Sequence, residues 1–77
     1  MADRRLQVFA TVARLLSFTK AAESLHMTQP AVTFQIRQLE DYFNTRLFDR
    51  THNRISLTSA GHLVQSYADQ IISLYSG

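Results

Sequence analysis

The stretch HMTQPAVTFQIRQLE, residues 26–40, predicts a helix whose two faces differ. Thr28 can act as its N-cap, and Pro30 falls in the first turn, where the N–H that proline lacks would have no partner within the helix. One arc of a helix over 29–43 is apolar and is expected to face the core: Val32, Ile36, Leu39 and Phe43. The opposite arc carries Pro30, Thr33, Phe34, Arg37 and Asp41. That outward face lacks the Glu and Lys residues of an ordinary solvated helix.

Two further helices are predicted before this stretch. From 4 to 16, apolar residues recur at spacings of three and four: Leu6, Phe9, Val12, Ala13 and Leu16. Thr19 is expected to cap a short second helix through about residue 25, which buries Ala21, Ala22 and Leu25. His26 would occupy the turn, because histidine is among the residue types tolerated at positive φ. A small residue at Ala22 lets the two helices approach closely, so the pair is predicted to be a helix-turn-helix.

The sequence after residue 43 predicts a hairpin followed by a long helix. Leu47 and Phe48 lead into a first strand, residues 51–54 read as a polar turn of four, and Ile55 and Leu57 share one face of a second strand. A lone hairpin is unstable, so this one must pack on the helices as a wing. Its tip is expected to point outward as a small basic loop of Arg50, His52, Asn53 and Arg54. Thr58 would cap a fourth helix to about residue 76.

The amino-acid composition limits the folds and functions that are possible for this chain. The 77 residues make one small domain, and Pro30, Gly61 and Gly77 are too few chain breakers for an all-β fold. The net charge of +2 is weak evidence for an anionic partner, although seven of the eight basic residues are arginine. There is no apolar run of about 20 residues and the start, MADRRLQ, is not a signal peptide, so we expect a cytoplasmic protein without a membrane partner.

The sequence favours neither a metal site nor an enzyme. There is no cysteine, which excludes disulfides and cysteine-based zinc sites. The three histidines, His26, His52 and His62, have no spacing of three or four that would place two of them on one helix face. Nothing places a nucleophile beside a base in a cleft. We therefore expect no cofactor, no metal and no catalytic residue.

These segments together resemble the N-terminal winged helix-turn-helix of LysR-type transcriptional regulators. The resemblance runs from Leu6 to Tyr75 and rests on FTKAAESLHMTQPAVTFQIRQLE (18–40), RLFDR (46–50) and ISLTSAG (55–61). It implies a bacterial DNA-binding module that dimerises through the helix over 58–76. It also implies a C-terminal effector-sensing domain that is absent from these residues and would bind any small-molecule effector.

The expected fold class is mainly α. A winged helix-turn-helix of three helices and a two-stranded β wing would occupy residues 1–57, and a long C-terminal linker helix forming the dimer interface would occupy 58–77. In the proposed complex, the helix over 29–43 lies in the major groove, and the wing over 48–57 lies on the flanking minor groove or backbone.

The N-terminal part of the helix over 29–43 is expected to contact bases. Gln29 can both donate to and accept from adenine, and Thr33 can bond to a base edge or touch a thymine methyl. Pro30 lies beside them on the same face. An exposed ring at Phe34 would suit a thymine methyl or a sugar edge, or it could fold back on the protein surface. The family often has Arg at this position, so Phe34 puts a guanine contact there in doubt.

Contacts to the DNA backbone are expected from other positions, because phosphate contacts fix register without reading sequence. The candidates are Thr19, Lys20, Thr28, Arg37, Arg50, His52, Asn53 and Arg54. Two of these have a plain structural alternative. Arg37 could pair with Asp41 at i, i+4, which stabilises a helix only slightly, and Arg50 could belong to an ordinary solvated strand end beside Asp49.

The helix over 58–76 has an apolar stripe wider than one packing face requires. An exposed apolar surface of that kind marks an interface, and a two-fold pairing would present two recognition helices to a pseudo-palindromic operator. The expected dimer interface is Leu63, Val64, Tyr67, Ile71, Leu74 and Tyr75. The alternative is that the stripe only closes the core of one chain.

Two function classes remain open at this stage. The first is sequence-specific binding of double-stranded DNA for transcription control. The second is a winged helix used as a protein-interaction module, which would account for the small net charge without DNA. RNA binding is a distant third, because the aromatic residues are placed for a core and not for base stacking on an open sheet.

Overall fold

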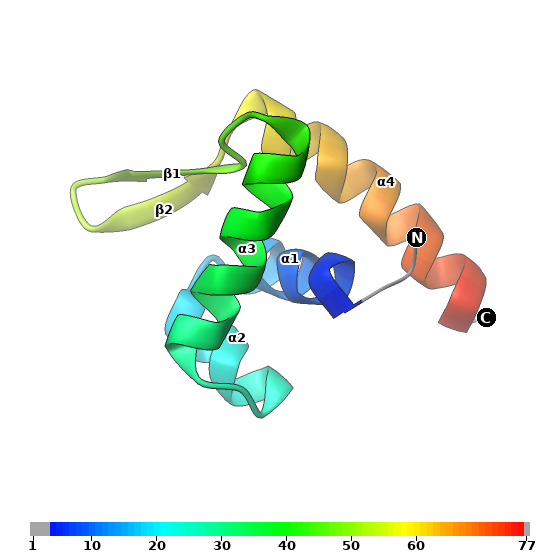
Figure 1. Cartoon of the computed structure of the whole chain (residues 1–77), viewed down its shortest axis with the longest axis horizontal. Coiled ribbons are helices and arrows are strands. Elements are labelled where there is room, and N and C mark those ends of the chain that lie inside the picture. Colours follow the sequence, from blue (N-terminus) through cyan, green and yellow to red (C-terminus); the bar gives the residue numbers. More distant parts are fainter. Residues whose placement is uncertain (1–3, 77) are drawn as a thin grey trace.

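Within residues 4–76, the fold consists of four helices and one two-stranded sheet. The computed structural model describes residues 4–76, with side chains for 4–74. The elements are α1 (Arg4–Leu15), α2 (Phe18–Leu25), α3 (Gln29–Phe43), β1 (Phe48–Thr51), β2 (Arg54–Leu57) and α4 (Ser59–Ser76). The β1–β2 wing and α4 extend in opposite directions from the body formed by α1, α2 and α3 (Figure 1). The predicted winged helix-turn-helix with a long C-terminal helix is confirmed.

The core forms where α1, α2 and α3 cross. Phe9 and Val12 of α1 are fully buried, as are Val32 of α3 and Leu47 before the wing. The apolar arc predicted for α3 is correct for Val32, Ile36 and Leu39, but Phe43 is 42% exposed. The prediction failed there because Leu39 is the last residue of the helix to reach the core. The ring of Phe43 instead packs edge-on against Tyr42, with centroids 5.1 Å apart.

The first two helices each differ by one or two residues from the prediction. Leu16, expected on the apolar stripe of the first helix, lies beyond α1 with φ 50° and is 47% exposed. The N-cap of α2 is Ser17 and not Thr19, because the Ser17 hydroxyl accepts from the Lys20 N–H at 3.0 Å. The helix thus begins at Phe18, whose ring packs on Phe48 of the wing.

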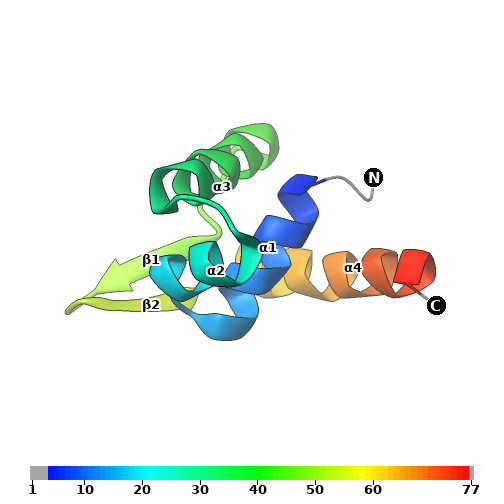
Figure 2. The same cartoon turned by 90° about the horizontal axis from the view of Figure 1, so that it is seen from below.

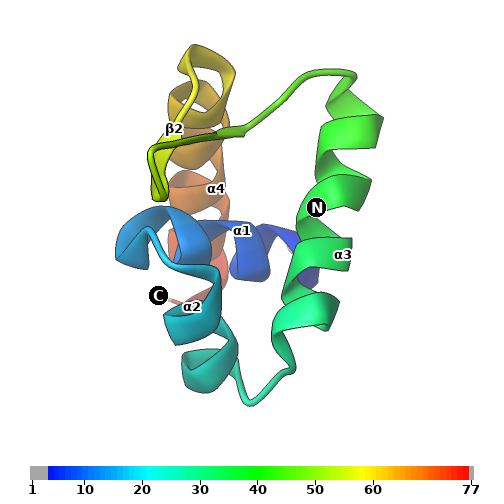
Figure 3. The same cartoon turned by 90° about the vertical axis from the view of Figure 1, so that its left-hand side faces the viewer.

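The turn between α2 and α3 has the conformation that the sequence predicts. His26 is left-handed, with φ 56°. The N–H of Met27 donates to Ala22 O at 2.9 Å, and the N–H of His26 donates to Glu23 O at 3.3 Å, which closes the end of α2. The predicted cap of α3 is confirmed, since the Thr28 hydroxyl accepts from the Ala31 N–H at 3.2 Å. Figure 3 shows the tight corner from which α3 rises.

The wing is an antiparallel ribbon with a shorter turn than predicted. Phe48 pairs with Leu57 and Thr51 with Arg54, so the turn consists of His52 and Asn53 alone. Both are left-handed, with φ 52° and 61°, as a two-residue hairpin turn with the twist of its strands requires. The expected four-residue turn over 51–54 is therefore wrong, because its first and last residues belong to the strands.

Hydrogen bonds connect the base of the wing to α3 on one side and to the start of α4 on the other. The Glu40 carboxylate of α3 accepts from the N–H of Leu47 at 2.8 Å and from that of Phe48 at 3.4 Å. The Thr58 hydroxyl donates to Arg46 O at 2.7 Å, and the Thr58 N–H donates to Leu47 O at 3.1 Å. The same hydroxyl accepts from the Gly61 N–H at 2.9 Å, which confirms Thr58 as the cap of α4.

The helix α4 closes the core with one face and leaves another exposed. Ala68 is fully buried, and Ala60, Val64 and Ile71 are partly buried against the core. Ile71, which the sequence places in the dimer interface, also packs against the core of its own chain, because α4 lies against α1 along this face. Leu63 and Tyr67 are each 59% exposed, and Leu74 is 82% exposed. The side chain of Tyr75 lies outside the described residues. In the described part of the chain, no helix has the length and apolar character to cross a membrane.

Candidate nucleic-acid interface

The outward face of α3 is uncovered. Figure 2 shows α3 standing apart on one side of the molecule, and within residues 4–76 no element lies over its outer side. Gln29 and Arg37 are exposed there, Thr33 is half-buried, and the ring of Phe34 is 59% exposed. The ring is thus largely open to solvent and not folded back on the surface. The Arg37–Asp41 ion pair considered above is absent from the described residues.

Two of the predicted base-contacting residues form a hydrogen bond with each other. The side-chain Nε2 of Gln29 donates to the Thr33 hydroxyl at 3.0 Å, along one helix turn. Gln29 keeps its amide oxygen and a second N–H, and Thr33 keeps its hydroxyl proton. Donors and an acceptor thus lie side by side on a rigid helix. Such a group is suited to reading the donor and acceptor pattern of a base edge.

A cleft lies between α2, α3 and the wing. It has a volume of about 600 Å³ and brings together five of the predicted residues: Thr19, Gln29, Arg50, His52 and Asn53. The capped start of α2 forms one wall, with Ser17 at its edge. The N-terminus of α2 and the Arg50 guanidinium both line this cleft and give it a positive electrostatic character.

A smaller cleft continues from the first along α3. Its volume is about 200 Å³, and Thr33, Arg37 and Arg50 line it together with Arg46. Sequence reasoning missed Arg46. Its signal was its place directly before the buried Leu47, in the polar segment 44–46, where a long basic side chain must point away from the core. Three arginines therefore meet beside the outward face of α3.

The remaining predicted DNA contacts line neither cleft. Thr28 is occupied as the cap of α3, while Lys20, Pro30 and Phe34 are exposed around the two clefts. Arg54 lies on the outer face of the ribbon, because it pairs with Thr51 and alternates with the inward Ile55.

The side chain of Arg50 lies on the opposite face of the wing from the one predicted. The sequence predicted it on an outward basic loop, but it shares the inner face of β1 with the buried Phe48, two residues before it. Its guanidinium carbon lies 4.7 Å from the centroid of the Phe18 ring. Strand alternation, counted from Phe48, was a signal that could have shown this.

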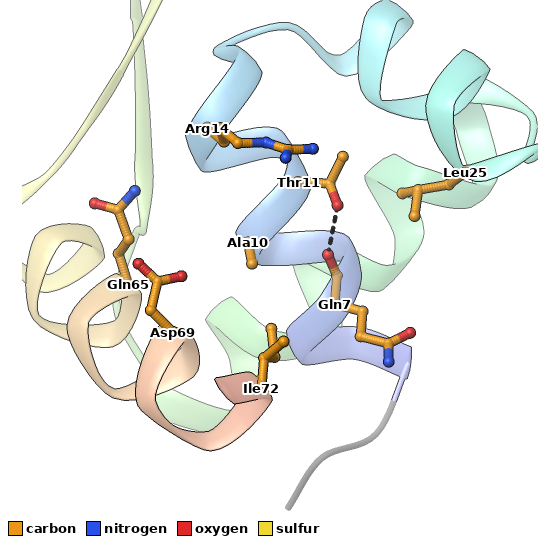
Figure 4. Close-up of a pocket in the computed structure, with 8 residues that line it drawn as sticks. All are labelled: Gln7, Ala10, Thr11, Arg14, Leu25, Gln65, Asp69 and Ile72. Atoms are coloured by element: carbon orange, nitrogen blue, oxygen red, sulfur yellow. Dashed lines mark hydrogen bonds between the residues drawn. The ribbon is translucent and has the colours of Figure 1, made fainter. Parts of the chain in front are cut away.

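Two other hollows lie away from these residues. The first is a cavity of about 440 Å³ that is lined by residues of α1 and α4 and by no predicted site residue. Arg14 and Asp69 extend into it from opposite walls (Figure 4). The second is an apolar groove of about 510 Å³ between α3 and α4. It brings together Leu63, Val64, Tyr67 and Ile71 of the predicted dimer surface with Tyr42 and Phe43 of α3, which sequence reasoning did not include.

Among the described residues, no group of three or more His, Cys, Asp or Glu residues could hold a metal ion. The two clefts present arginine side chains and polar groups, and the exposed Phe34 ring lies beside them. The one carboxylate that lines them, Glu40, accepts hydrogen bonds from the N–H groups of Leu47 and Phe48. The chemistry of the site is therefore that of binding an anionic, hydrogen-bonding partner.

The chain matches the model of the family described as "Bacterial regulatory helix-turn-helix protein, lysR family" over residues 4–62. It is 46% identical over 69 residues to the HTH-type transcriptional regulator CfxR of Cupriavidus necator, covering 90% of this chain and 22% of that protein. It is 50% identical over 68 residues to the RuBisCO operon transcriptional regulator of Allochromatium vinosum, covering 88% and 22%. The chain thus spans about a fifth of the length of these relatives.

Solved structures have the same fold. A BenM_DBD/catB site 1 DNA complex has a TM-score of 0.90 and 34% identity, covering 95% of this chain and 81% of that one. A CbnR_DBD–DNA complex has a TM-score of 0.88 and 37% identity, covering 95% and 84%. Full-length CbnR, a LysR family transcriptional regulator, has a TM-score of 0.88 and 37% identity, covering 95% of this chain and 25% of that one.

Proposed function

This chain belongs to the LysR family of bacterial helix-turn-helix regulators, and from that premise we propose that it binds double-stranded DNA sequence-specifically as part of a transcriptional regulator. The support comes from relatives that are named transcriptional regulators and from two similar structures that are complexes with DNA. The proposed role is binding and not catalysis. Since a bacterial regulator of transcription acts on the chromosome, we propose a cytoplasmic location.

The observation that carries the proposal is the uncovered face of α3 with its bonded Gln29–Thr33 pair. With α3 in the major groove, Gln29 would bond to adenine and Thr33 to a neighbouring base. The exposed ring of Phe34 would contact a thymine methyl, with Pro30 against the same groove wall. Because the pair is held within the helix, little side-chain entropy would be lost on binding.

Phosphate contacts would flank this face on both sides. On one side are the start of α2, with Thr19 and Lys20, and the cap of α3 at Thr28. On the other side are Arg37 of α3 and the wing: Arg50, His52, Asn53 and Arg54. We add Arg46, which lies in the smaller cleft beside Arg37. These contacts would fix the position of α3 along the duplex without reading bases.

We further propose a homodimer through α4, over 58–76, that binds a pseudo-palindromic operator. The apolar groove between α3 and α4 and the exposed Leu63, Tyr67 and Leu74 give the surface that such a pairing would cover. Val64, Ile71 and Tyr75 complete the proposed interface. Any small-molecule effector would act through a C-terminal domain of the longer protein.

Selection of bound sequences from a random duplex library tests the main proposal. We expect a preferred site with two-fold symmetry and A·T pairs where Gln29 and Phe34 would contact bases. Gln29→Ala should relax the preference at its base pair, with a loss of about 1–3 kcal/mol in discrimination. If no duplex is enriched, sequence-specific binding is refuted and the protein-interaction alternative, which the small net charge of +2 permits, gains support.

A salt series tests the backbone contacts separately. Affinity for the selected duplex should fall with a log–log slope of about −0.9 per neutralised phosphate, and Arg54→Ala should reduce the magnitude of that slope by roughly one. The matched control is Arg14→Ala, which removes the same charge from the cavity between α1 and α4. The control should leave the slope unchanged. Equal effects of the two substitutions would show that net charge, and not the wing contact, matters.

A further inference from the structure

The side chain of Arg50 lies over an aromatic ring and is paired with no carboxylate of residues 4–74. Its guanidinium carbon lies 4.7 Å from the Phe18 ring centroid, within the distance of about 6 Å at which cation–π attraction operates. Strand alternation places Arg50 on the inner face of β1, two residues after Phe48. Arg50 therefore extends across the gap between the wing and the first residue of α2.

The ring that supports Arg50 is itself held in place by the core. Phe18 packs edge-on against Phe48, with centroids 5.8 Å apart and planes at 67°. Phe48 in turn packs on Phe9 at 5.3 Å. Phe48 is 3% exposed and Phe9 is fully buried, so three aromatic rings connect the centre of the core to the guanidinium group. The position of the Phe18 ring is fixed further by the cap of α2 at Ser17.

Stacking leaves the donors of Arg50 free. The attraction between the guanidinium charge and the face of the Phe18 ring uses none of the N–H donors of Arg50 in a hydrogen bond. Glu40 lines the same small cleft, but one of its carboxylate oxygens already accepts from the N–H groups of Leu47 and Phe48. Asp49 alternates to the outer face of the ribbon. The charge on Arg50 is thus kept available for an anion from outside the chain.

Arg50 also lies at the point where the two clefts meet. It lines the larger cleft, with Thr19 and Gln29, and the smaller one, with Thr33 and Arg37. A phosphate bound by Arg50 would therefore lie beside the Gln29–Thr33 pair. The direction in which the guanidinium points would set how far α3 enters the groove.

We propose that Phe18 is a positioning residue that holds the Arg50 guanidinium ready for a DNA phosphate next to the reading face of α3. This inference rests on the proposed DNA binding. Phe18 itself touches no DNA in this account. Its contribution is that Arg50 reaches the phosphate already ordered, so the complex forms without restricting a long, freely rotating side chain.

The test is a double-mutant cycle on the selected duplex. Phe18→Leu keeps an apolar contact with Phe48 but removes the ring face, and should weaken binding about two- to five-fold, as expected for an exposed cation–π pair. Arg50→Ala should weaken binding more. In the Arg50→Ala background, Phe18→Leu should have no further effect, because the ring then has nothing to position. Phe18→Tyr retains a ring and should bind like the natural protein.

A matched background separates positioning from a general effect on the fold. Arg54 lies on the opposite face of the ribbon, so Phe18→Leu should keep its full effect in an Arg54→Ala protein. An equal loss in the Arg50→Ala and Arg54→Ala backgrounds would overturn the inference, since the ring would then act through the fold and not through Arg50. An unchanged affinity of Phe18→Leu alone would overturn it as well.

A measurement without DNA keeps the inference distinct from the proposed function. In NMR spectra of the free protein, the side-chain protons of Arg50 should show an upfield ring-current shift that Phe18→Leu removes and Phe18→Tyr retains. If this shift is present and no duplex is bound, the proposed function fails while the stacking stands. If the shift is absent from the natural protein, the inference fails whether or not DNA is bound.

Discussion

Replacing Gly61 with alanine should destabilise this protein, although alanine is the better helix former. Gly61 lies in the first turn of α4, and within a helix glycine costs about 1 kcal/mol relative to alanine. A Cβ at Gly61, however, would overlap the carbonyl oxygen of Leu47 and lie 2.8 Å from Cδ2 of Leu57. The Leu47 carbonyl belongs to the backbone and cannot rotate away. The start of α4 would have to retreat from the base of the wing by about 1 Å to restore ordinary contact.

The retreat would stretch two hydrogen bonds of Thr58: its N–H bond to Leu47 O, now 3.1 Å, and its hydroxyl bond to Arg46 O, now 2.7 Å. Overpacking costs about 1–3 kcal/mol, and a lost hydrogen bond about 0.5–1.5 kcal/mol. After subtracting the gain in helix propensity, we expect Gly61→Ala to lower the free energy of unfolding by about 2 kcal/mol. For a domain of this size, that corresponds to a fall in Tm of about 8–16 °C.

The assay is thermal unfolding followed by circular dichroism, at one fixed protein concentration because a dimer would make Tm depend on concentration. The matched control is Ser66→Ala, at an exposed position of the same helix. It should leave Tm unchanged or raise it slightly. If Gly61→Ala unfolds at the same Tm as the natural protein, the backbone at the base of the wing can move aside at little cost. The argument from the close contact with the Leu47 carbonyl would then be refuted.

Two further predictions concern side chains that accept hydrogen bonds from the backbone. Glu40→Gln replaces the charged acceptor of the Leu47 N–H by a neutral one and should lower the free energy of unfolding in urea by about 1 kcal/mol. The control Asp41→Asn removes the same charge from an exposed position and should leave this free energy almost unchanged. Equal values for the two variants would contradict the role of Glu40. Ser17→Ala should lower stability by about 1 kcal/mol through loss of the α2 cap, and Thr19→Ala should be nearly neutral; the reverse order would restore Thr19 as the cap.

The sequence predicted the start and the end of α3 because independent local signals agree there. The cap at Thr28, the proline in the first turn and the apolar arc all indicate the same helix, and the structure confirms it from Gln29 to Phe43. The start of α2 was less determined, since Ser17 and Thr19 both have hydroxyl groups that can cap. The structure caps at Ser17 and includes Phe18 in the helix, where it packs on Phe48, a residue remote in the sequence. A contact between residues so far apart in the sequence cannot be predicted from local sequence patterns.

The wing shows a second limit of sequence reasoning. A two-residue turn of His52 and Asn53 lacks the glycine that usually marks such turns, so the turn was predicted too long. The inward direction of Arg50 was readable from strand alternation, but the contact with Phe18 depends on how the ribbon packs on α2. Phe43 shows the same dependence, because an apolar arc does not reveal where a helix passes the end of its core.

The short connection between α3 and β1 is fastened to α3 through Glu40 and to the start of α4 through Thr58. We therefore expect a torque applied at the far end of α4 to be transmitted through these hydrogen bonds to the wing and α3. The wing and α3 would swing with α4 as one rigid body. In the proposed homodimer, a reorientation of α4 would then alter the spacing between two such bodies, while the shape of each one is preserved.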